Sequence, residues 1–228
     1  MDEKIPPSAY DKAEIEKHYH NFNVKNGRYH YIIQQLKPSS RILEVGCFLG
    51  HYCNHFKSLG HEPSGIDISP SVIDEAHKCY PDLDLRCIDG SSLEEEFDEN
   101  TFDAVIASEV IEHVLFPQDF LKSIKKVLKP DGRLLLTTQN SNAFHYRLRM
   151  LFGQFRWDPT HLRLYSKPEL MEEIESAGFE INSMKGIPIN PEGPQQFVRK
   201  MAYYSVVFNA NFCWTWGVNA KPLKGHSA

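Results

Sequence analysis

Two histidines of this 228-residue chain are placed, relative to acids and apolar runs, in ways that suit removal of a proton from a substrate. His113 ends the E-x-x-E-H segment that starts at Glu109 and follows a β-branched apolar run, and His161 lies between two short apolar stretches. An imidazole changes charge near neutral pH, so either side chain is a candidate general base. Each also has a structural interpretation, His113 as a hydrogen-bonded residue at a helix start and His161 as a residue that pins a loop.

The same region also offers a set of candidate metal ligands. Glu109, Glu112, His113 and His161 provide two carboxylates and two imidazoles. A mixed shell of oxygen and nitrogen atoms suits Mg²⁺ or Mn²⁺. The general-base and metal interpretations therefore compete for the same side chains.

A second group of residues could hold a nucleoside. In L-E-V-G-C-F-L-G, Gly46 lets the chain turn sharply after a strand and Gly50 opens a helix, whose first N–H groups are unpaired. Phe48 occupies the middle position of a G-x-G-x-x-G pattern, so the backbone cannot approach a pyrophosphate closely and a dinucleotide is disfavoured. Asp67 lies 21 residues after Gly46, the separation expected of an acid that binds ribose hydroxyls.

A basic stretch lies between Ser141 and Lys167. It holds five cations and the single anion Asp158, although the whole chain has a formal net charge of −5. It could be a solvated helix face, or an electropositive cap over an acceptor that carries phosphate or carboxylate. In the second case the acceptor-binding residues would be Arg147, Arg149, Arg156 and Arg163.

Alternating strands and helices must position these groups. From Arg41 to Thr138 short apolar runs alternate with helical segments, which predicts βαβ units, a mainly parallel sheet and an α/β fold. We expect strands at 41–45, 63–68, 83–88, 102–107, 133–138 and near 179–184, and helices at 50–59, 117–128, 167–177 and one begun by Ser69 and Pro70. The carboxyl edge of such a sheet is where ligands bind.

We expect one domain over 1–228. Its segments would be an N-terminal helical cap at 1–40, a cofactor-binding core at 41–139, a substrate cap at 140–166, and a C-terminal helix with the last strands at 167–228. The stretch 201–218 has no charged residue and several aromatic ones. It is interpreted as a core helix followed by the last strand, with a membrane-surface or partner contact as the alternative.

Composition excludes several classes of protein. Five cysteines without a C-x-x-C pair argue against a disulfide framework and a structural zinc site. The net negative charge does not suit general nucleic-acid binding. The first residues, with Asp2, Glu3 and Lys4, do not form a secretory signal, so we expect a cytoplasmic protein without a transmembrane segment. A homodimer is compatible with these features.

From Arg41 to Met184 the sequence resembles the class I S-adenosylmethionine-dependent methyltransferases. The matching motifs are Glu44 to Gly50, Gly65-Ile66-Asp67, Cys87-Ile88-Asp89-Gly90, Phe102 to His113, and the turn Leu128-Lys129-Pro130-Asp131-Gly132. The resemblance implies a doubly wound, seven-stranded, mostly parallel Rossmann-like sheet and S-adenosylmethionine as the cofactor. It also implies that Gly46 and Gly50 flank the methionine moiety, that Asp67 takes the ribose hydroxyls, and that Asp89 and Gly90 lie beside the adenine. The predicted cofactor-binding set is Glu44, Gly46, Cys47, Phe48, Gly50, Asp67, Ile68, Asp89, Gly90 and Ser108.

We therefore expect methyl transfer to an oxygen of a small anionic acceptor, such as a sugar derivative, a phenol or a natural-product intermediate. His161 or His113 would take the proton. We expect no metal, because similar E-x-x-E-H segments occur in metal-free small-molecule members of the family. Two alternatives stay open: a metal-dependent RNA ribose 2′-O-methyltransferase, whose metal site looks similar, and a non-catalytic module that binds S-adenosylmethionine.

Overall fold

The computed structural model describes residues 27–153, 160–188, 200 and 209–223 of the chain. Within them, one seven-stranded sheet has the strand order β3-β2-β1-β4-β5-β7-β6. β1 to β5 run parallel to one another, and β7 lies antiparallel between β5 and β6. The predicted α/β class and the mostly parallel, seven-stranded sheet are confirmed. The strand order reverses between β1 and β4, the point at which open α/β sheets bind their ligands.

The elements follow the sequence pattern closely. The strands are β1 Arg41–Val45, β2 Glu62–Asp67, β3 Asp84–Cys87, β4 Phe102–Ser108, β5 Leu128–Gln139, β6 Phe179–Ile187 and β7 Thr215–Pro222. The α-helices are α2 Gly27–Ile33, α3 His51–Ser58, α4 Pro70–Cys79, α5 Pro117–Val127, α6 Phe144–Leu151 and α7 Lys167–Ser176. Short 3₁₀ turns occur at η1 Leu93–Glu95, η2 Ile111–His113 and η3 Ala210–Phe212.

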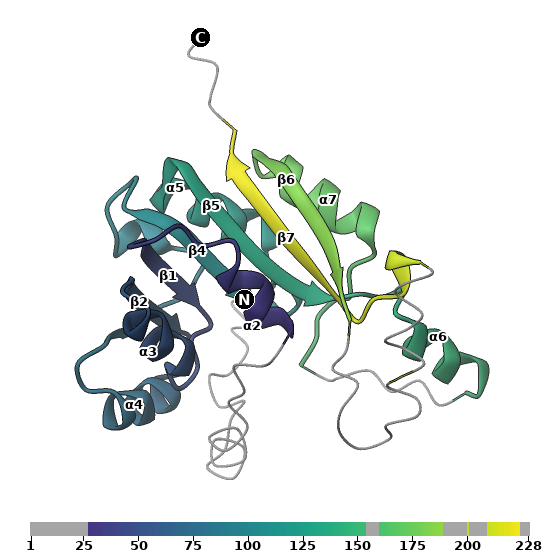
Figure 1. Ribbon diagram of the computed structural model, residues 1–228, viewed down its shortest axis with the longest axis horizontal. Helices are drawn as coiled ribbons and strands as arrows, with labels where there is room; N and C mark the ends of the chain where they lie inside the picture. Colours follow the sequence, from purple (N-terminus) through teal and green to yellow (C-terminus); the bar gives the residue numbers. More distant parts are fainter. Residues whose placement is uncertain (1–26, 154–159, 189–199, 201–208, 224–228) are drawn as a thin grey trace, which may run out of the picture.

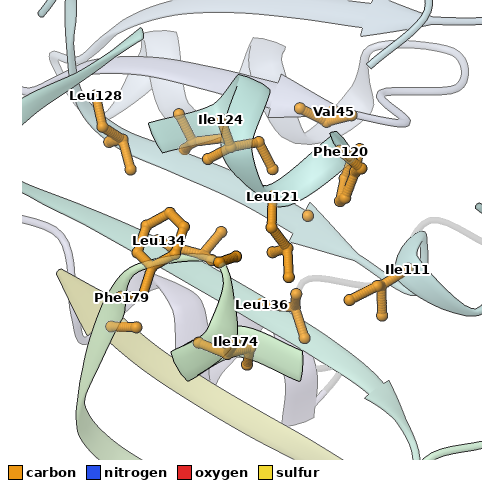
Figure 2. Packing of buried hydrophobic residues seen from close by; sticks show 14 of the residues in the cluster. Val45, Ile111, Phe120, Leu121, Ile124, Leu128, Leu134, Leu136, Ile174 and Phe179 are labelled. Atoms are coloured by element: carbon orange, nitrogen blue, oxygen red, sulfur yellow. The ribbon is translucent and has the colours of Figure 1, made fainter. Parts of the chain in front are cut away.

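Alternating side chains of the central strands build a core on each face of the sheet. Leu43 and Leu136 point toward α5 and α7, where they join the largest buried cluster. Figure 2 shows this packing, with Leu121 and Ile124 of α5 and Ile174 of α7 facing the strands. Ile42, Ile106 and Leu135 point to the opposite face, against α2 and α3. Figure 1 shows α2 and α3 in front of the sheet and α5 and α7 behind it. Burial on both faces fixes the register of the strands and so the position of their carboxyl ends.

One local expectation was wrong, and another was confirmed in position. The segment 129–132 was expected to be a turn before strand five, but β5 begins at Leu128, which pairs with Phe102. The register then shifts, so that Ala104 pairs with Arg133, and the extra residues are accommodated as an irregularity of the strand. Ser69 lies at the N-cap position of α4 as predicted, but its side chain makes no capping hydrogen bond there and contacts the Ser71 hydroxyl at 3.1 Å instead.

The chain ends are described only in part. Of the expected N-terminal helices, the structure describes α2, which packs on β6 and β7. The expected last strand is present as β7, whereas the helix expected before it falls largely on 201–208, outside the described residues. No helix among the described residues is long and apolar enough to cross a membrane.

Candidate active site at the carboxyl edge of the sheet

The turn after β1 forms the floor of the candidate cofactor site. Gly46 has a φ of 73°, and a Cβ atom there would lie 2.7 Å from Cγ2 of Val110. The N–H groups of Gly46 and Cys47 both donate to the Ile66 carbonyl, at 2.8 and 2.9 Å. Gly50, with a φ of 75°, is the N-cap of α3. Glycine is therefore required at position 46, because the backbone there is left-handed and because Val110, in the loop after β4, approaches closely.

Asp67 organises this turn from the end of β2. One carboxylate oxygen accepts the Phe48 N–H at 3.1 Å, and the other accepts the Ser69 N–H at 3.0 Å. Burial raises the pKa of Asp67, and these backbone donors lower it. A carboxylate has about four lone-pair directions, so Asp67 can still accept a hydrogen bond from a ribose hydroxyl.

The next two strand ends supply a surface that suits an adenosine. Ile68 is 60% exposed, although it is a large apolar residue that directly follows Asp67. Asp89 is exposed after β3, where its Oδ1 accepts the Ser91 N–H at 2.9 Å. A Cβ on Gly90 would lie 2.9 Å from the Phe120 ring, so a larger residue would displace this loop. Acceptors for two hydroxyls beside an exposed apolar side chain fit the ribose and the adenine of the expected cofactor.

Glu44 and the two cysteines near it lie beneath the turn. The Glu44 carboxyl is fully buried, it accepts a hydrogen bond from the Cys53 thiol at 3.0 Å, and burial raises its pKa to about 8. The Cys47 side chain is buried in the cluster that contains Cys53 and Ile73, so only its backbone can face a ligand. Ser108, at the end of β4, shares a hydrogen bond of 2.9 Å with the Thr137 hydroxyl.

The acceptor-side candidates converge beyond β4. Glu112, His113 and His161 each place a ligand atom within 4.8 Å of the other two. The imidazoles of His113 and His161 meet edge to face, with ring centroids 4.7 Å apart. His161 approaches because the backbone N–H of Leu162 donates to the Glu112 carbonyl at 2.9 Å, which fastens the cap segment to η2. The structure thus brings together two histidines 48 positions apart in the sequence.

One hydrogen bond sets the tautomer of His113. Its Nδ1 lies 2.9 Å from the Thr160 carbonyl oxygen. A carbonyl only accepts, so Nδ1 carries the proton in this bond. In the neutral imidazole Nε2 then holds the lone pair that a general base needs.

Glu112 is the buried acid of this group. Its side chain is 0% exposed, and its Oε2 accepts the Thr138 hydroxyl at 2.9 Å. Among residues 27–153, 160–188 and 209–223, its Oε1 has no hydrogen-bond partner. Burial, followed by the charge of Glu109, raises the pKa of Glu112. A cation seated between Glu112, His113 and His161 would satisfy the unpartnered oxygen, so these three residues fit a metal ion.

Glu109 does not join that group. Its carboxylate forms an ion pair with Arg28 of α2 at 2.9 Å and accepts the Thr137 hydroxyl at 3.2 Å. Of the four candidate metal ligands considered from the sequence, the structure therefore brings together three. Arg28, Thr137 and Thr138 were missed: the two threonines follow the apolar run of β5 and could have been noticed as polar residues at a strand end, whereas nothing near Arg28 indicates its partner.

Two of the four predicted acceptor-binding arginines contact other protein groups. Arg147 donates to Asn142 at 3.0 Å and lies 5.3 Å from the Phe212 ring centroid. Arg163 donates to the Leu115 carbonyl at 2.9 Å. Arg149 is exposed on α6, and Arg156 lies outside the described residues. Their role toward an acceptor stays a prediction.

Comparisons with known proteins agree with this geometry. The family model of the methyltransferase domain matches residues 18–183. The mitochondrial ubiquinone biosynthesis O-methyltransferase of Bos taurus is 37% identical over 174 residues, which cover 68% of this chain and 46% of that protein. The ubiquinone biosynthesis O-methyltransferase of Rhodopseudomonas palustris (strain BisB5) is 32% identical over 161 residues, covering 66% of this chain and 62% of the other.

The likeness to solved structures concerns the fold. A SAM-dependent methyltransferase from Archaeoglobus fulgidus superimposes with a TM-score of 0.67 at 17% identity, over 92% of this chain and 100% of the other. The chain spans about half of the length of the mammalian relatives it matches.

Proposed function

This chain belongs to the class I family of S-adenosylmethionine-dependent methyltransferases, and we propose that it transfers the methyl group of that cofactor to an oxygen of a small anionic acceptor. A phenol that carries a carboxylate is the first candidate. The observation that carries the proposal is the meeting of Glu112, His113 and His161 within 4.8 Å of one another, next to the cofactor turn. Val110, two residues before Glu112, touches Gly46. The loop that carries the acceptor-side residues is therefore in direct contact with the turn that would hold the cofactor.

The chemistry needs positioning and one proton acceptor. S-adenosylmethionine supplies an electrophilic methyl group on a sulfonium sulfur. The acceptor hydroxyl forms the new O–CH₃ bond, while the electrons of the broken S–CH₃ bond stay on sulfur and leave a neutral thioether. The hydroxyl proton passes to an imidazole, for which Nε2 of His113 has the required lone pair. A well-placed general base contributes about 10²- to 10⁴-fold to such a step.

Oxygen as the methylated atom is supported by the relatives, whose names describe O-methyltransferases. Precursors of ubiquinone are phenolic, which favours a phenol over a sugar. The charge of the acceptor is argued from the excess of cations in 141–167. Localisation in the cytoplasm and a homodimeric state remain predictions.

The test is release of S-adenosylhomocysteine from S-adenosylmethionine with 3,4-dihydroxybenzoate as the acceptor probe. We expect release that depends on the probe, formation of its methyl ether, and about 10²-fold or greater loss in His113→Gln. Catechol, which lacks the carboxylate, should have a higher KM. Asp74→Asn, on an exposed face of α4, is the matched control and should behave like the parent. Absence of release with phenols, carboxylated sugars and RNA alike would favour a non-catalytic binding module.

A cation-assisted reaction is the second candidate, favoured by the unpartnered Glu112 oxygen beside two imidazoles. A divalent ion there would hold the acceptor oxygen and lower its pKa. Electron paramagnetic resonance measures Mn²⁺ binding to the parent and to Glu112→Gln. Binding that is lost in Glu112→Gln, together with activity that a chelator abolishes, supports the metal. If activity survives chelation, the imidazole is the proton acceptor. If RNA also yields no methylated product, RNA ribose is excluded as the methyl acceptor.

A further inference from the structure

The loop that carries the acceptor-side residues starts at a strained position. Glu109, the first residue after β4, has a φ of 58°, in the left-handed region that side chains other than glycine rarely adopt. The next residue, Val110, is the one that touches Gly46 of the cofactor turn, and η2 with Glu112 and His113 follows directly. A strained backbone persists only where its surroundings hold it.

Three contacts hold Glu109 in this conformation. Its backbone N–H donates to the Thr137 carbonyl at 2.8 Å, and its carboxylate accepts the Thr137 hydroxyl at 3.2 Å. The third contact is the ion pair with Arg28, whose side chain is 33% exposed against 16% for Glu109. Partial burial strengthens this pair relative to an ordinary surface ion pair, and the backbone of Glu109 is held by its bond to Thr137.

Arg28 comes from an element that is itself tightly seated. In α2, Tyr29 stacks on Tyr52 of α3 with ring centroids 4.7 Å apart. A Cβ on Gly217 of β7 would meet the Tyr31 ring at 2.8 Å, so β7 and α2 are in close contact. α2 therefore contacts both α3, the helix that begins at the cofactor turn, and β7. Through Arg28 it also reaches the loop that follows β4.

We propose that Arg28 is a positioning residue of the methyl-transfer site: its ion pair with Glu109 holds the 109–113 loop in the geometry in which His113 and Glu112 face the acceptor. The inference rests on the proposed function for its catalytic consequence, but the positioning itself is independent of turnover. In this proposal Arg28 acts through Glu109, whose carboxylate its guanidinium contacts. Its sequence neighbours give no sign of this role, because the partner lies 81 residues away.

Backbone amide exchange followed by NMR tests the positioning. The amides of Glu109 and His113 are both hydrogen-bonded, to Thr137 and Val110, and report opening of the loop. We expect Arg28→Gln to raise their exchange rates about tenfold or more, as loss of a partly buried ion pair predicts, with the amides of β1 unchanged. Lys37→Gln is the matched control, because it removes the same charge from another ion pair, Lys37 with Asp131. Equal exchange in Arg28→Gln and the parent, or an equal rise in the control, would overturn the proposal.

A double-mutant cycle separates the ion pair from simple truncation. In the Glu109→Gln background, Arg28→Gln should add less than about twofold to amide exchange, because the pair is already broken. Arg28→Lys should restore most of the protection. Full additivity of the two substitutions would contradict the mechanism.

Measurements of turnover provide a second test of the proposal. With 3,4-dihydroxybenzoate, Arg28→Gln should lower kcat about tenfold while the Kd for S-adenosylhomocysteine changes by less than about twofold. Arg28→Lys should recover kcat. If amide exchange responds as expected and the parent shows no turnover with any acceptor, the positioning stands and the proposed function fails. If the parent turns over and Arg28→Gln has an unaltered kcat, positioning for catalysis is rejected.

Discussion

Asp67 accepts the backbone N–H of Phe48 at 3.1 Å, so the acid at the end of β2 holds a phenylalanine at a φ of 49° in the turn after β1. Phe48 therefore adopts the left-handed conformation of a glycine at the position where the sequence departs from a glycine-rich pattern. The same carboxylate that is expected to bind ribose also fixes the turn on which the cofactor would lie.

Asp67→Asn should weaken binding of S-adenosylhomocysteine by about 10- to 100-fold, because an amide replaces the charged acceptor of the ribose hydroxyls and of two backbone donors. Calorimetric titration measures the Kd directly. Asp74→Asn changes an exposed acid of α4 and serves as the control. Its Kd should stay within about twofold of that of the parent. An unchanged Kd in Asp67→Asn would remove Asp67 from the site.

Phe48→Gly should be more stable than Phe48→Ala by about 1 kcal/mol, since both lose the ring and only alanine keeps the left-handed strain. Urea unfolding gives the difference. At Leu59, where φ is −89°, the same pair of substitutions should show the reverse order. If alanine were the better replacement at both positions, the strain at Phe48 would be disproved.

Sequence patterns predicted the central strands well because each has a local signal. The run from Arg41 to Val45 is β-branched and ends at a glycine, and β1 has those bounds. The start of β5 was missed, because Pro130 and Gly132 indicate a turn while pairing of Leu128 with Phe102 extends the strand. Tertiary pairing outweighs local preference there.

The site was predictable to the extent that it lies on strand ends. His113 and His161 were each expected at or above the ligand edge, and the structure brings the two rings together. The place of Glu109 was not predictable: its partner Arg28 comes from a helix that precedes the sheet, and no periodicity connects the two.

Glu44 should make the unfolding free energy of the ligand-free protein fall as pH rises. Below about pH 4.5 the carboxyl is protonated in both states, and above about pH 8 it is ionised in both. Between these values the unfolded state releases a proton that the folded state keeps, so the unfolded state gains stability. Glu44→Gln, which retains an acceptor for Cys53, should flatten this dependence and add on the order of 3 kcal/mol at pH 7.

Chemical denaturation of the parent and Glu44→Gln at pH 4, 6 and 8 checks the sign. The two curves should meet at pH 4 and separate as pH rises. Glu62→Gln, an exposed position on β2, serves as the control and should follow the parent throughout. A gap that is as large at pH 4 as at pH 8 would show that titration of Glu44 is not the cause.

Thr138→Val should destabilise the protein by about 1–3 kcal/mol, although the two side chains have nearly the same shape. The Thr138 hydroxyl donates to Oε2 of the fully buried Glu112 at 2.9 Å, and within the part of the chain that the structure describes Oε1 has no hydrogen-bond partner, so the valine would remove the side-chain donor of a buried carboxyl group. Thr138→Ser keeps the donor and should recover most of the loss. Thr101→Val removes an exposed hydroxyl that donates to the Asp98 carbonyl at 2.7 Å and should cost less than about 1 kcal/mol. Urea unfolding of the three variants decides the point: if Thr138→Val and Thr101→Val cost the same, Glu112 does not depend on Thr138.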